Sequence, residues 1–191
     1  MAIKLALFAS GSGSNAENII RFFAEKHKIE VVLVVSSRSD TFVLDRAERL
    51  NIPSCVLTRD DMNNTPDKVM GILKEYQVDF IVLAGYLLKV PDYLIHAFPN
   101  AIINIHPALL PKYGGKGMYG DNVHKAVVAA GEKESGITIH YVNEHYDEGQ
   151  IVFQARCEVL PTDSFSDVAR KVHELEYAHF PQVIEQILTK G

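Results

Sequence analysis

Residues 3–20 read IKLALFASGSGSNAENII and join an apolar run, a glycine-rich turn and an amphipathic segment. The compact apolar run is typical of a buried strand, because a strand that is covered on both faces needs apolar side chains on both. In the amphipathic segment, Ile19 and Phe23 lie on one stripe of a helix that Ser14 or Asn15 can cap. A buried strand that turns through glycines into a helix predicts a parallel α/β sheet.

The same alternation of apolar runs and amphipathic segments continues to His106. The runs are short, rich in β-branched residues and bounded by turn residues, which is typical of interior parallel strands. Parallel strands are connected by right-handed crossovers, so we expect helices on both faces of the sheet. The expected strands are 3–10, 30–37, 54–58, 79–85 and 101–106, and the expected helices are 14–27, 41–51 and 66–77.

The pattern changes after the fifth expected strand. Two apolar runs, 136–142 and 150–159, are separated by only a few polar residues, which predicts a hairpin-like antiparallel strand pair. The closing segment 164–189 predicts a helix that is interrupted or kinked at Pro181. We therefore expect an α/β fold, a doubly wound and mostly parallel Rossmann-like sheet with an antiparallel C-terminal strand pair, in a single domain over residues 1–191.

The composition of the chain excludes several classes of protein. Its 191 residues suit one domain with a sizeable core, and no apolar run is long enough to span a membrane. A formal net charge of -5 argues against a nucleic-acid-binding surface, although a basic pocket for one small anion is allowed. Cys55 and Cys157 form neither a disulfide framework nor a metal motif, so we expect reduced thiols in a cytoplasmic protein.

The glycine-rich turn satisfies the loose dinucleotide-binding pattern through Gly11, Gly13 and Ala16. Glycines allow the backbone to approach a ligand closely, and the free N–H groups of a helix N-terminus attract an anion. A dinucleotide also needs an acidic residue at the end of the second strand, where residues 36–38 read Ser-Ser-Arg. The turn therefore predicts a site for the phosphate of a mononucleotide-sized ligand. A nicotinamide dinucleotide site and a turn that binds nothing are the alternatives.

Asn104 and His106 are polar residues at the end of the apolar run 101–106. Residues two apart in a strand share a face, so both side chains project to one side at the carboxyl end of a parallel strand, where open α/β sheets bind ligands. Their N–H groups can donate to a developing oxyanion, and the imidazole can pass a proton. Either residue alone could be structural; the pair predicts an acyl-transfer site.

A carboxylate near His106 is expected to raise the pKa of the imidazole and to accept the nucleophile's proton through a water. Asp147 is the best candidate for that carboxylate, but spacing alone leaves Glu144 and Glu148 open. The chain has no G-x-S-x-G nucleophile motif. The two histidines of segment 140–145 lack a third ligand, so we expect no metal.

Four motifs, in this order, resemble those of the folate-dependent formyltransferases. They are GSGSN at 11–15, VLAGY at 82–86, NIHPALLPKY at 104–113 and DEG at 147–149, and the resemblance covers nearly the whole chain. It implies a doubly wound sheet and an enzyme that transfers a formyl group from 10-formyltetrahydrofolate to the amine of glycinamide ribonucleotide, in de novo purine (IMP) biosynthesis. It also implies small-molecule partners only, no metal, and a cytoplasmic monomer or weak homodimer.

The resemblance assigns roles to the residues that match the family's motifs. Asn104 and His106 would stabilise the oxyanion, and Asp147 would keep the imidazole charged and order a water that relays the proton. The amine would attack directly, without a covalent enzyme intermediate, and give formylglycinamide ribonucleotide. The ribonucleotide would be bound by Gly13, Ser14, Asn15, Gly85 and Glu176, and the folate by Leu87, Leu88, Lys89, Val90, Asn104, Val142, Asn143, Glu144, His145, Tyr146 and Asp147.

Some features depart from the family pattern or leave alternatives open. Segment 113–122 is rich in glycine, so we expect a mobile lid over the phosphate, with Lys112 or Lys116 as contacts. Arg59 is the nearest candidate to hold the folate tail, and ordinary core packing is the alternative for 87–90. Competing functions are a different formyl-folate enzyme, such as a deformylase, a non-catalytic nucleotide-binding module, and a nicotinamide oxidoreductase.

Overall fold

The structure is a computed structural model that describes residues 2–189. These residues fall into two compact units, one formed by 2–103 with 187–189 and the other by Asn104–Gln186. The fifth strand, β5 (Ile102–His106), begins in the first unit and ends in the second. The expectation of a single domain over the whole chain stays a prediction.

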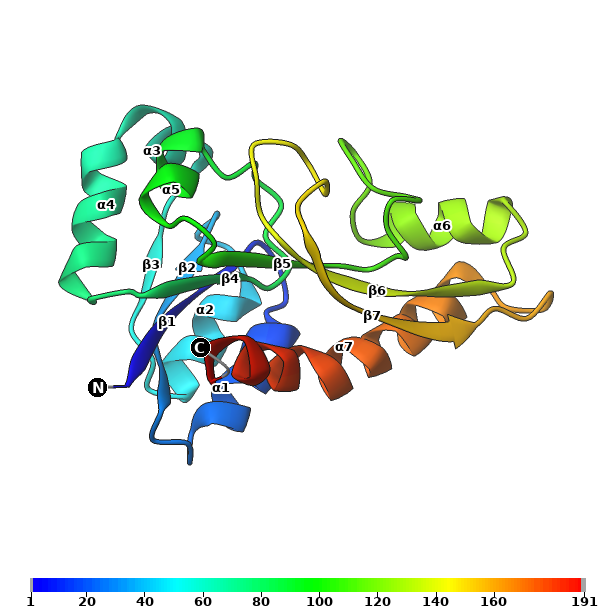
Figure 1. The fold of residues 1–191 in the computed structure, drawn as a ribbon, viewed down its shortest axis with the longest axis horizontal. Helices are drawn as coiled ribbons and strands as arrows, with labels where there is room; N and C mark the ends of the chain where they lie inside the picture. Colours follow the sequence, from blue (N-terminus) through cyan, green and yellow to red (C-terminus); the bar gives the residue numbers. More distant parts are fainter. Residues whose placement is uncertain (1, 190–191) are drawn as a thin grey trace. The chain divides into compact units, whose positions relative to one another are not determined.

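The first unit contains a parallel sheet (Figure 1) whose longer strands are mostly buried, whereas its short outer strand is partly exposed. Its strands pair in the order β3-β2-β1-β4, and Leu7 in the middle strand lies opposite Val34 on one side and Val82 on the other. All three side chains are fully buried, as apolar runs of this kind predict. The strands are β1 (Ile3–Ala9), β2 (Ile29–Ser36), β3 (Ser54–Val56) and β4 (Phe80–Leu83), and the helices are α1 (Ser14–Phe23), α2 (Phe42–Arg49), α3 (Arg59–Asn64), α4 (Pro66–Glu75) and α5 (Asp92–Ala97).

The second unit is built on the antiparallel pair of β6 (Glu134–Tyr141) and β7 (Ile151–Glu158). Figure 1 shows these two strands side by side as a long pair. The pairing register shifts between Ile139 and His140, directly before the loop that joins the strands. The unit also contains α6 (Asp121–Ala129) and most of α7 (Phe165–Thr189).

The strand order β3-β2-β1-β4-β5-β6-β7 confirms the predicted α/β fold class, with parallel strands first and an antiparallel C-terminal pair. Three details differ from expectation. The helix cap of α1 is the backbone of Gly13 rather than the side chain of Ser14 or Asn15, and α1 ends at Phe23. The helices α3, α5 and α6 are short and were not expected from the sequence pattern.

The last helix runs through Pro181 without a break, so the expected interruption is wrong. A proline inside a helix removes one backbone hydrogen bond, but it does not by itself end a helix whose neighbouring turns are held by packing. Here Phe180 is fully buried, as are Val183 and Ile184 on the next turn. Among residues 2–189, none of the helices has the length and apolar character needed to cross a membrane.

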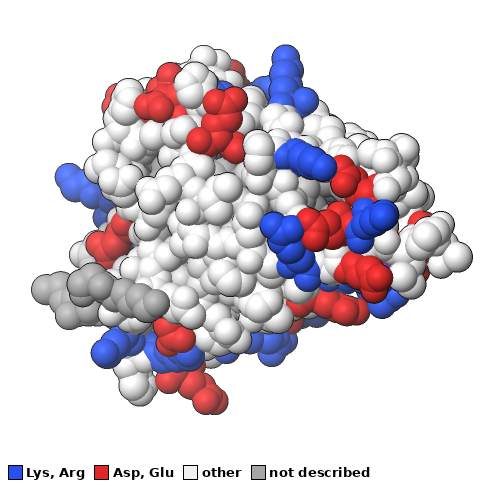
Figure 2. Space-filling view, turned by 45° about the vertical axis from the view of Figure 1, so that its right-hand side comes forward, with Lys and Arg blue, Asp and Glu red and all other residues white. Residues whose placement is uncertain are grey.

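Charged side chains of both signs lie next to one another on the face drawn in Figure 2, and uncharged residues cover much of the same face. Several of the charges in the structure are paired, as in the ion pair between Arg156 and Glu134 on β7 and β6. Exposed pairs of this kind contribute little to stability, so the folded state depends mainly on its apolar core.

Candidate functional site

Strand β5 carries both polar residues that the sequence singled out to one end of the strand. His106 is its last residue, and Pro107 follows and cannot continue a central strand. The His106 side chain is 4% exposed and Asn104 is half-buried, so neighbouring residues rather than water surround most of both side chains. Because side chains alternate between the two faces of a strand, Asn104 and His106 point to the same face.

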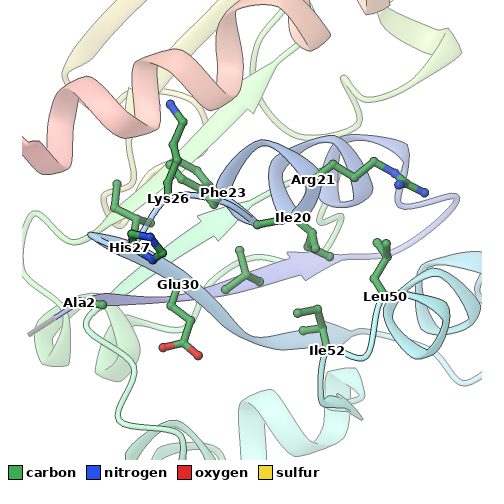
Figure 3. A pocket seen from close by; sticks show the side chains of 12 residues that line it. Ala2, Ile20, Arg21, Phe23, Lys26, His27, Glu30, Leu50 and Ile52 are labelled. Carbon is green, nitrogen blue, oxygen red and sulfur yellow. The ribbon is translucent and has the colours of Figure 1, made fainter.

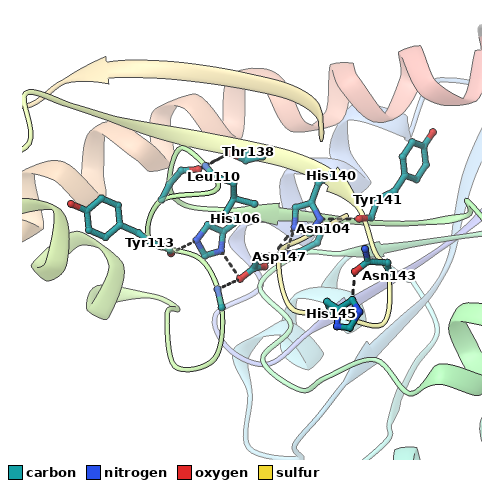
Figure 4. A network of polar contacts seen from close by, with 12 residues as sticks. Asn104, His106, Leu110, Tyr113, Thr138, His140, Tyr141, Asn143, His145 and Asp147 are labelled. Atoms are coloured by element: carbon teal, nitrogen blue, oxygen red, sulfur yellow. Dashed lines mark hydrogen bonds and ion pairs between the residues drawn. The ribbon is translucent and has the colours of Figure 1, made fainter. Parts of the chain in front are cut away.

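Both ring nitrogens of His106 have a partner, as Figure 4 shows. Nε2 lies 2.7 Å from the carbonyl oxygen of Tyr113, and Nδ1 lies 3.6 Å from Oδ2 of Asp147. A carbonyl oxygen can only accept a hydrogen bond, so Nε2 carries a proton and donates it. The second nitrogen, Nδ1, faces the carboxylate.

Asp147 lies in the loop between β6 and β7 and is the carboxylate that the structure brings to His106. Its backbone has a φ of 57°, the left-handed conformation that few non-glycine residues adopt. Oδ2 accepts a 2.9 Å hydrogen bond from the N–H of Gly115, which ties this loop to the loop after β5. The other two acidic candidates, Glu144 and Glu148, have exposed side chains.

Asn104 is held by a second histidine, His140 on β6. Its Nδ2 lies 3.2 Å from Nε2 of His140, whose Nδ1 lies 2.9 Å from the carbonyl oxygen of Tyr141. That carbonyl can only accept a hydrogen bond, so Nδ1 of His140 donates to it, and Nε2 is left to accept from the amide of Asn104. The same Nε2 lies 3.6 Å from Oδ1 of Asp147. The four side chains therefore form one network.

Sequence reasoning considered His140 only as a metal ligand and did not predict its place in this network. A signal for it exists in the sequence. In β6, Thr138 and His140 are polar residues two apart that alternate with the buried Ile137 and Ile139, the same pattern that drew attention to β5. Thr138 also serves the site indirectly, because its hydroxyl donates to Ala108 O at 2.7 Å and accepts from Leu110 N–H at 3.0 Å.

Burial lowers the pKa of His106, and this effect outweighs the Asp147 carboxylate and the Tyr113 carbonyl, which both raise that pKa. The nearby carboxylate raises the pKa of His106 as expected, but removing the imidazolium from water is the larger effect, so the net pKa is lowered and the cation is not favoured. Burial also acts on Asp147 and by itself would raise its pKa. The neighbouring His140 and His106 and the N–H of Gly115 bring the pKa of Asp147 below its usual value. In the resting protein near pH 7, His106 is therefore neutral and Asp147 is ionised.

Glu176 on α7 is a buried carboxylate in the second unit, with 5% of its surface exposed. It accepts a 2.8 Å hydrogen bond from Nδ1 of His173, and this contact raises the pKa of that histidine. His124 on α6 is also buried, and burial lowers its pKa. The charge of His106 also contributes to the shift of His124, so these residues lie within electrostatic range of one another. Sequence reasoning assigned a role to Glu176 but to neither histidine.

The residues predicted to bind a phosphate lie in the first unit, at the start of α1. Gly13 has a φ of 71°, and a Cβ at this position would overlap the side chain of Val43. Only glycine fits such a position. The turn is fixed further by Arg46, whose Nε donates to Ser12 O at 2.8 Å. Ser14 and Asn15 occupy the first turn of α1, where backbone N–H groups have no partner within the helix.

The segment after β4 was predicted to contribute to both ligand sites. Gly85 has a φ of 79° and accepts a 3.0 Å hydrogen bond from the N–H of Ser10. Of the residues predicted to contact folate, Val90 is buried in the core and fits the core-packing alternative, whereas Leu87 is 49% exposed. A large exposed leucine is available to a flat apolar ligand.

Some of the remaining predicted residues make hydrogen bonds within the second unit. Lys112 donates to Glu132 at 2.8 Å, so its ammonium group is already occupied in this structure. In the loop before Asp147, the N–H of His145 donates to Oδ1 of Asn143 at 3.0 Å (Figure 4). Among residues 2–189, no group of three or more potential metal ligands comes together.

A separate groove lies in the first unit and contains none of the predicted site residues (Figure 3). It has a volume of about 580 Å³, and its walls include Ile20, Phe23, Leu50 and Ile52. Ile20 and Phe23 are core residues of α1, so the groove follows from how this helix packs beside β2.

Comparison with known proteins identifies relatives along almost the whole chain. The formyl transferase family matches residues 3–184. The phosphoribosylglycinamide formyltransferase of Bacillus subtilis is 36% identical over 189 residues, which is 97% of this chain and 94% of the relative. The Haemophilus influenzae enzyme of the same name is 36% identical over 186 residues, 95% of this chain and 85% of the relative.

The chain spans a smaller share of the plant relatives. The chloroplastic phosphoribosylglycinamide formyltransferase of Arabidopsis thaliana is 40% identical over 96% of this chain, but this chain covers 65% of its length. Among solved structures, the phosphoribosylglycinamide formyltransferase from Anaplasma phagocytophilum has a TM-score of 0.89 at 28% identity, with 100% of this chain and 89% of that chain covered. The structure from Streptococcus pneumoniae has a TM-score of 0.86 at 33% identity and covers 98% and 99%.

Proposed function

Because the chain belongs to the formyl transferase family, we propose that it transfers a formyl group from 10-formyltetrahydrofolate to the amine of glycinamide ribonucleotide. The product is formylglycinamide ribonucleotide, an intermediate of purine biosynthesis. The observation that carries the proposal is the network of Asn104, His106 and Asp147 at the end of β5. The names of the bacterial relatives support the same acceptor.

Asn104 and His106 are the proposed oxyanion stabilisers. The amide of Asn104 has two N–H bonds, and His140 takes only one of them, so the other can donate to the negative charge that develops on the formyl oxygen. His106 begins neutral, and the ionised Asp147 favours its protonation as negative charge develops nearby. The proton that the attacking amine loses through the water at Asp147 is passed to His106, so the imidazolium forms as this charge develops. The proton then goes to the folate nitrogen when tetrahydrofolate leaves.

Asp147 is the proposed acceptor for a proton that leaves the attacking amine. Its pKa is below the usual value, so at neutral pH both oxygen atoms can accept hydrogen bonds. Oδ2 is engaged by Gly115 and faces His106, and Oδ1 faces His140, so the carboxylate is rigidly oriented. A rigid acceptor can order the water that relays the proton.

The ligand sites complete the proposal. We infer that Gly13, Ser14 and Asn15 bind the phosphate, that Gly85 lies near the amine, and that Glu176 binds the ribose hydroxyls. The positive end of the α1 dipole suits a phosphate, as do the N–H groups of its first turn, which have no partner within the helix. The folate ring is assigned to Leu87, Leu88 and the loop 142–147, whereas Val90 packs in the core. When bound, the folate supplies the formyl carbon, and no residue of this chain becomes covalently attached to it.

We also infer that both units act together as one formyltransferase domain in the cytoplasm, with small molecules as the only partners, as a monomer or weak homodimer. The family match spans residues of both units, which supports one functional domain. Size-exclusion chromatography with light scattering measures the oligomeric state.

The direct test mixes the purified protein with a chromophoric 10-formyl folate and follows loss of the formyl group by absorbance. Loss only in the presence of glycinamide ribonucleotide is the expected result. Loss without the ribonucleotide would identify a deformylase instead. No loss in either mixture would contradict the proposal, and sugar nucleotides with a free amine would be the next acceptors to test.

A further inference from the structure

Tyr113 has an unusual backbone conformation beside the candidate catalytic histidine. Its φ is 57°, in the left-handed region that bulky non-glycine residues rarely adopt. A bulky residue in this conformation is strained and persists only where its surroundings hold it. The conformation directs the Tyr113 carbonyl to Nε2 of His106 at 2.7 Å (Figure 4).

The side chain of Tyr113 is held by a second anchor away from His106. Its hydroxyl donates to Oε1 of Glu132 at 2.9 Å, and Nζ of Lys112 donates to the same oxygen at 2.8 Å. The hydrogen bonds from Lys112 and Tyr113 lower the pKa of Glu132, so the carboxylate stays ionised and accepts both bonds at neutral pH. Glu132 lies in the turn between α6 and β6, outside the network around His106.

Tyr113 and Asp147 favour opposite tautomers of a neutral His106. A carboxylate beside Nδ1 favours the tautomer with a proton on Nδ1, whereas a carbonyl beside Nε2 favours the tautomer with a proton on Nε2. The carbonyl is closer, at 2.7 Å, than the carboxylate, at 3.6 Å. The shorter hydrogen bond decides the tautomer in favour of Nε2–H.

We propose that Tyr113, anchored by Glu132, is a positioning residue that sets the Nε2–H tautomer of His106 and so makes Nδ1 the nitrogen that exchanges protons. The kinetic consequence rests on the proposed formyl transfer, but the tautomer does not. With Nδ1 as the exchanging nitrogen, the proton is gained and lost on the side of the ring that faces Asp147. The other groups that act on His106 electrostatically are His140, Glu176 and His124.

The tautomer can be measured in the resting protein, without substrate. Protein labelled with ¹⁵N in its histidines is examined by long-range ¹H–¹⁵N NMR, which distinguishes protonated from unprotonated ring nitrogens, and the His106 signals are assigned by their loss in His106→Gln. The wild type is expected to show a protonated Nε2 and an unprotonated Nδ1. Tyr113→Phe and Glu132→Gln are expected to shift the His106 population toward the Nδ1–H tautomer. A wild-type Nδ1–H tautomer would overturn the proposal.

Kinetics give the second readout. In Tyr113→Phe, kcat is expected to fall roughly 5- to 10-fold, the loss that one hydrogen bond of about 1 kcal/mol implies, with KM for the ribonucleotide unchanged. The Tyr113 carbonyl raises the pKa of His106, so weakening this contact should move the His106 inflection in the pH profile to lower pH. Glu132→Gln should have smaller effects in the same direction, because its amide oxygen can still accept from Tyr113.

Two matched variants control for the loss of a tyrosine hydroxyl and for surface charge. Tyr76→Phe removes a hydroxyl from a tyrosine at the end of α4, outside the predicted site segments, and Glu134→Gln neutralises a nearby carboxylate that pairs with Arg156. Both are expected to match the wild type in tautomer and kcat. If Tyr113→Phe and Glu132→Gln also match the wild type in both readouts, the proposal is wrong. A wild type with the Nε2–H tautomer but no formyl transfer would instead contradict the proposed function alone.

Discussion

At the scale of single residues, the protonation of His106 is determined by burial more than by charge. His106 lies beside an ionised carboxylate and still has a lowered pKa, because a buried imidazolium loses its hydration. A neutral histidine that can become charged suits a group that responds to charge development on a substrate. A permanent cation would suit this role less well, because it would also bind anionic products.

Replacing His106 by Ala should therefore abolish turnover with little effect on substrate binding. We expect kcat to fall by about 10²–10⁴-fold, the range for a positioned acid–base group, because no neighbouring side chain can supply a proton at the same place. Ribonucleotide affinity, measured by calorimetry, should stay within about twofold, since binding interactions shared by the ground state are kept. His27→Ala, at an exposed histidine of the first unit, is the control and should retain full activity. Near-normal turnover of His106→Ala would refute the assignment.

His140 offers a second test at this scale. Removing it leaves the Asn104 amide without its 3.2 Å partner, so the amide can rotate away from its productive orientation. His140→Ala should lower kcat by roughly 10-fold, in line with the loss of an orienting hydrogen bond. His140→Gln, whose terminal amide reaches about as far as Nε2, should retain more activity than the alanine variant. Equal activity of the two variants would contradict an orienting role.

At the scale of elements, strand ends and the turns after them supply the candidate groups. The end of β5 carries Asn104 and His106, and the turn between β6 and β7 carries Asp147. The turns are tightly constrained: a Cβ on Gly149 would overlap the carbonyl oxygen of Tyr141, and one on Gly114 would overlap Leu110. Rigid elements position side chains, and constrained turns keep that position.

The turn before α1 allows a matched pair of glycine variants. Gly13→Ala introduces a Cβ at a φ of 71° against Val43, whereas Gly11→Ala meets no atom within 4 Å. We expect Gly13→Ala to lower the free energy of unfolding by about 1–3 kcal/mol and to raise KM for the ribonucleotide, because the strained turn must shift. Gly11→Ala should change stability much less. Urea denaturation and steady-state kinetics measure both effects, and equal effects of the two variants would contradict a special role for Gly13.

At the scale of the whole molecule, buried titratable groups connect stability to pH. Burial lowers the pKa values of His106 and His124, so the unfolded chain binds more protons than the folded one between the folded pKa and about 6.5. Their contribution to stability is present above pH 6.5 and is lost as the pH falls through the folded pKa. His173 has a raised pKa and acts in the opposite direction, but its side chain is 55% exposed and its effect is screened.

We therefore expect the free energy of unfolding to decrease as the pH falls from 7.5 to 5.5. Urea denaturation at several pH values measures this slope. In His124→Gln the slope should be shallower, because a group that must be protonated in the unfolded state has been removed. A wild-type stability that is constant or rises toward pH 5.5 would show that His173 and other groups outweigh the two buried histidines.

The sequence determined the fold class and the nature of the site by itself. Apolar runs such as 31–35 have no polar face, which excludes a solvent-exposed strand, and the alternation in β5 puts Asn104 and His106 on one face whatever their surroundings. The glycine turn likewise follows from local chemistry. These are properties of short stretches, in which steric limits and side-chain periodicity act without reference to distant residues.

Only the tertiary structure decided which of several groups that lie near one another in the sequence reaches the site. Glu144, Asp147 and Glu148 are equivalent in spacing, and packing alone brings Asp147 to His106. The role of His140, the tautomer set by Tyr113 and the lowered pKa of His106 also depend on contacts between distant segments. Desolvation and hydrogen-bond distance depend on which atoms surround a group, and in a folded chain those atoms come from residues far away along the sequence.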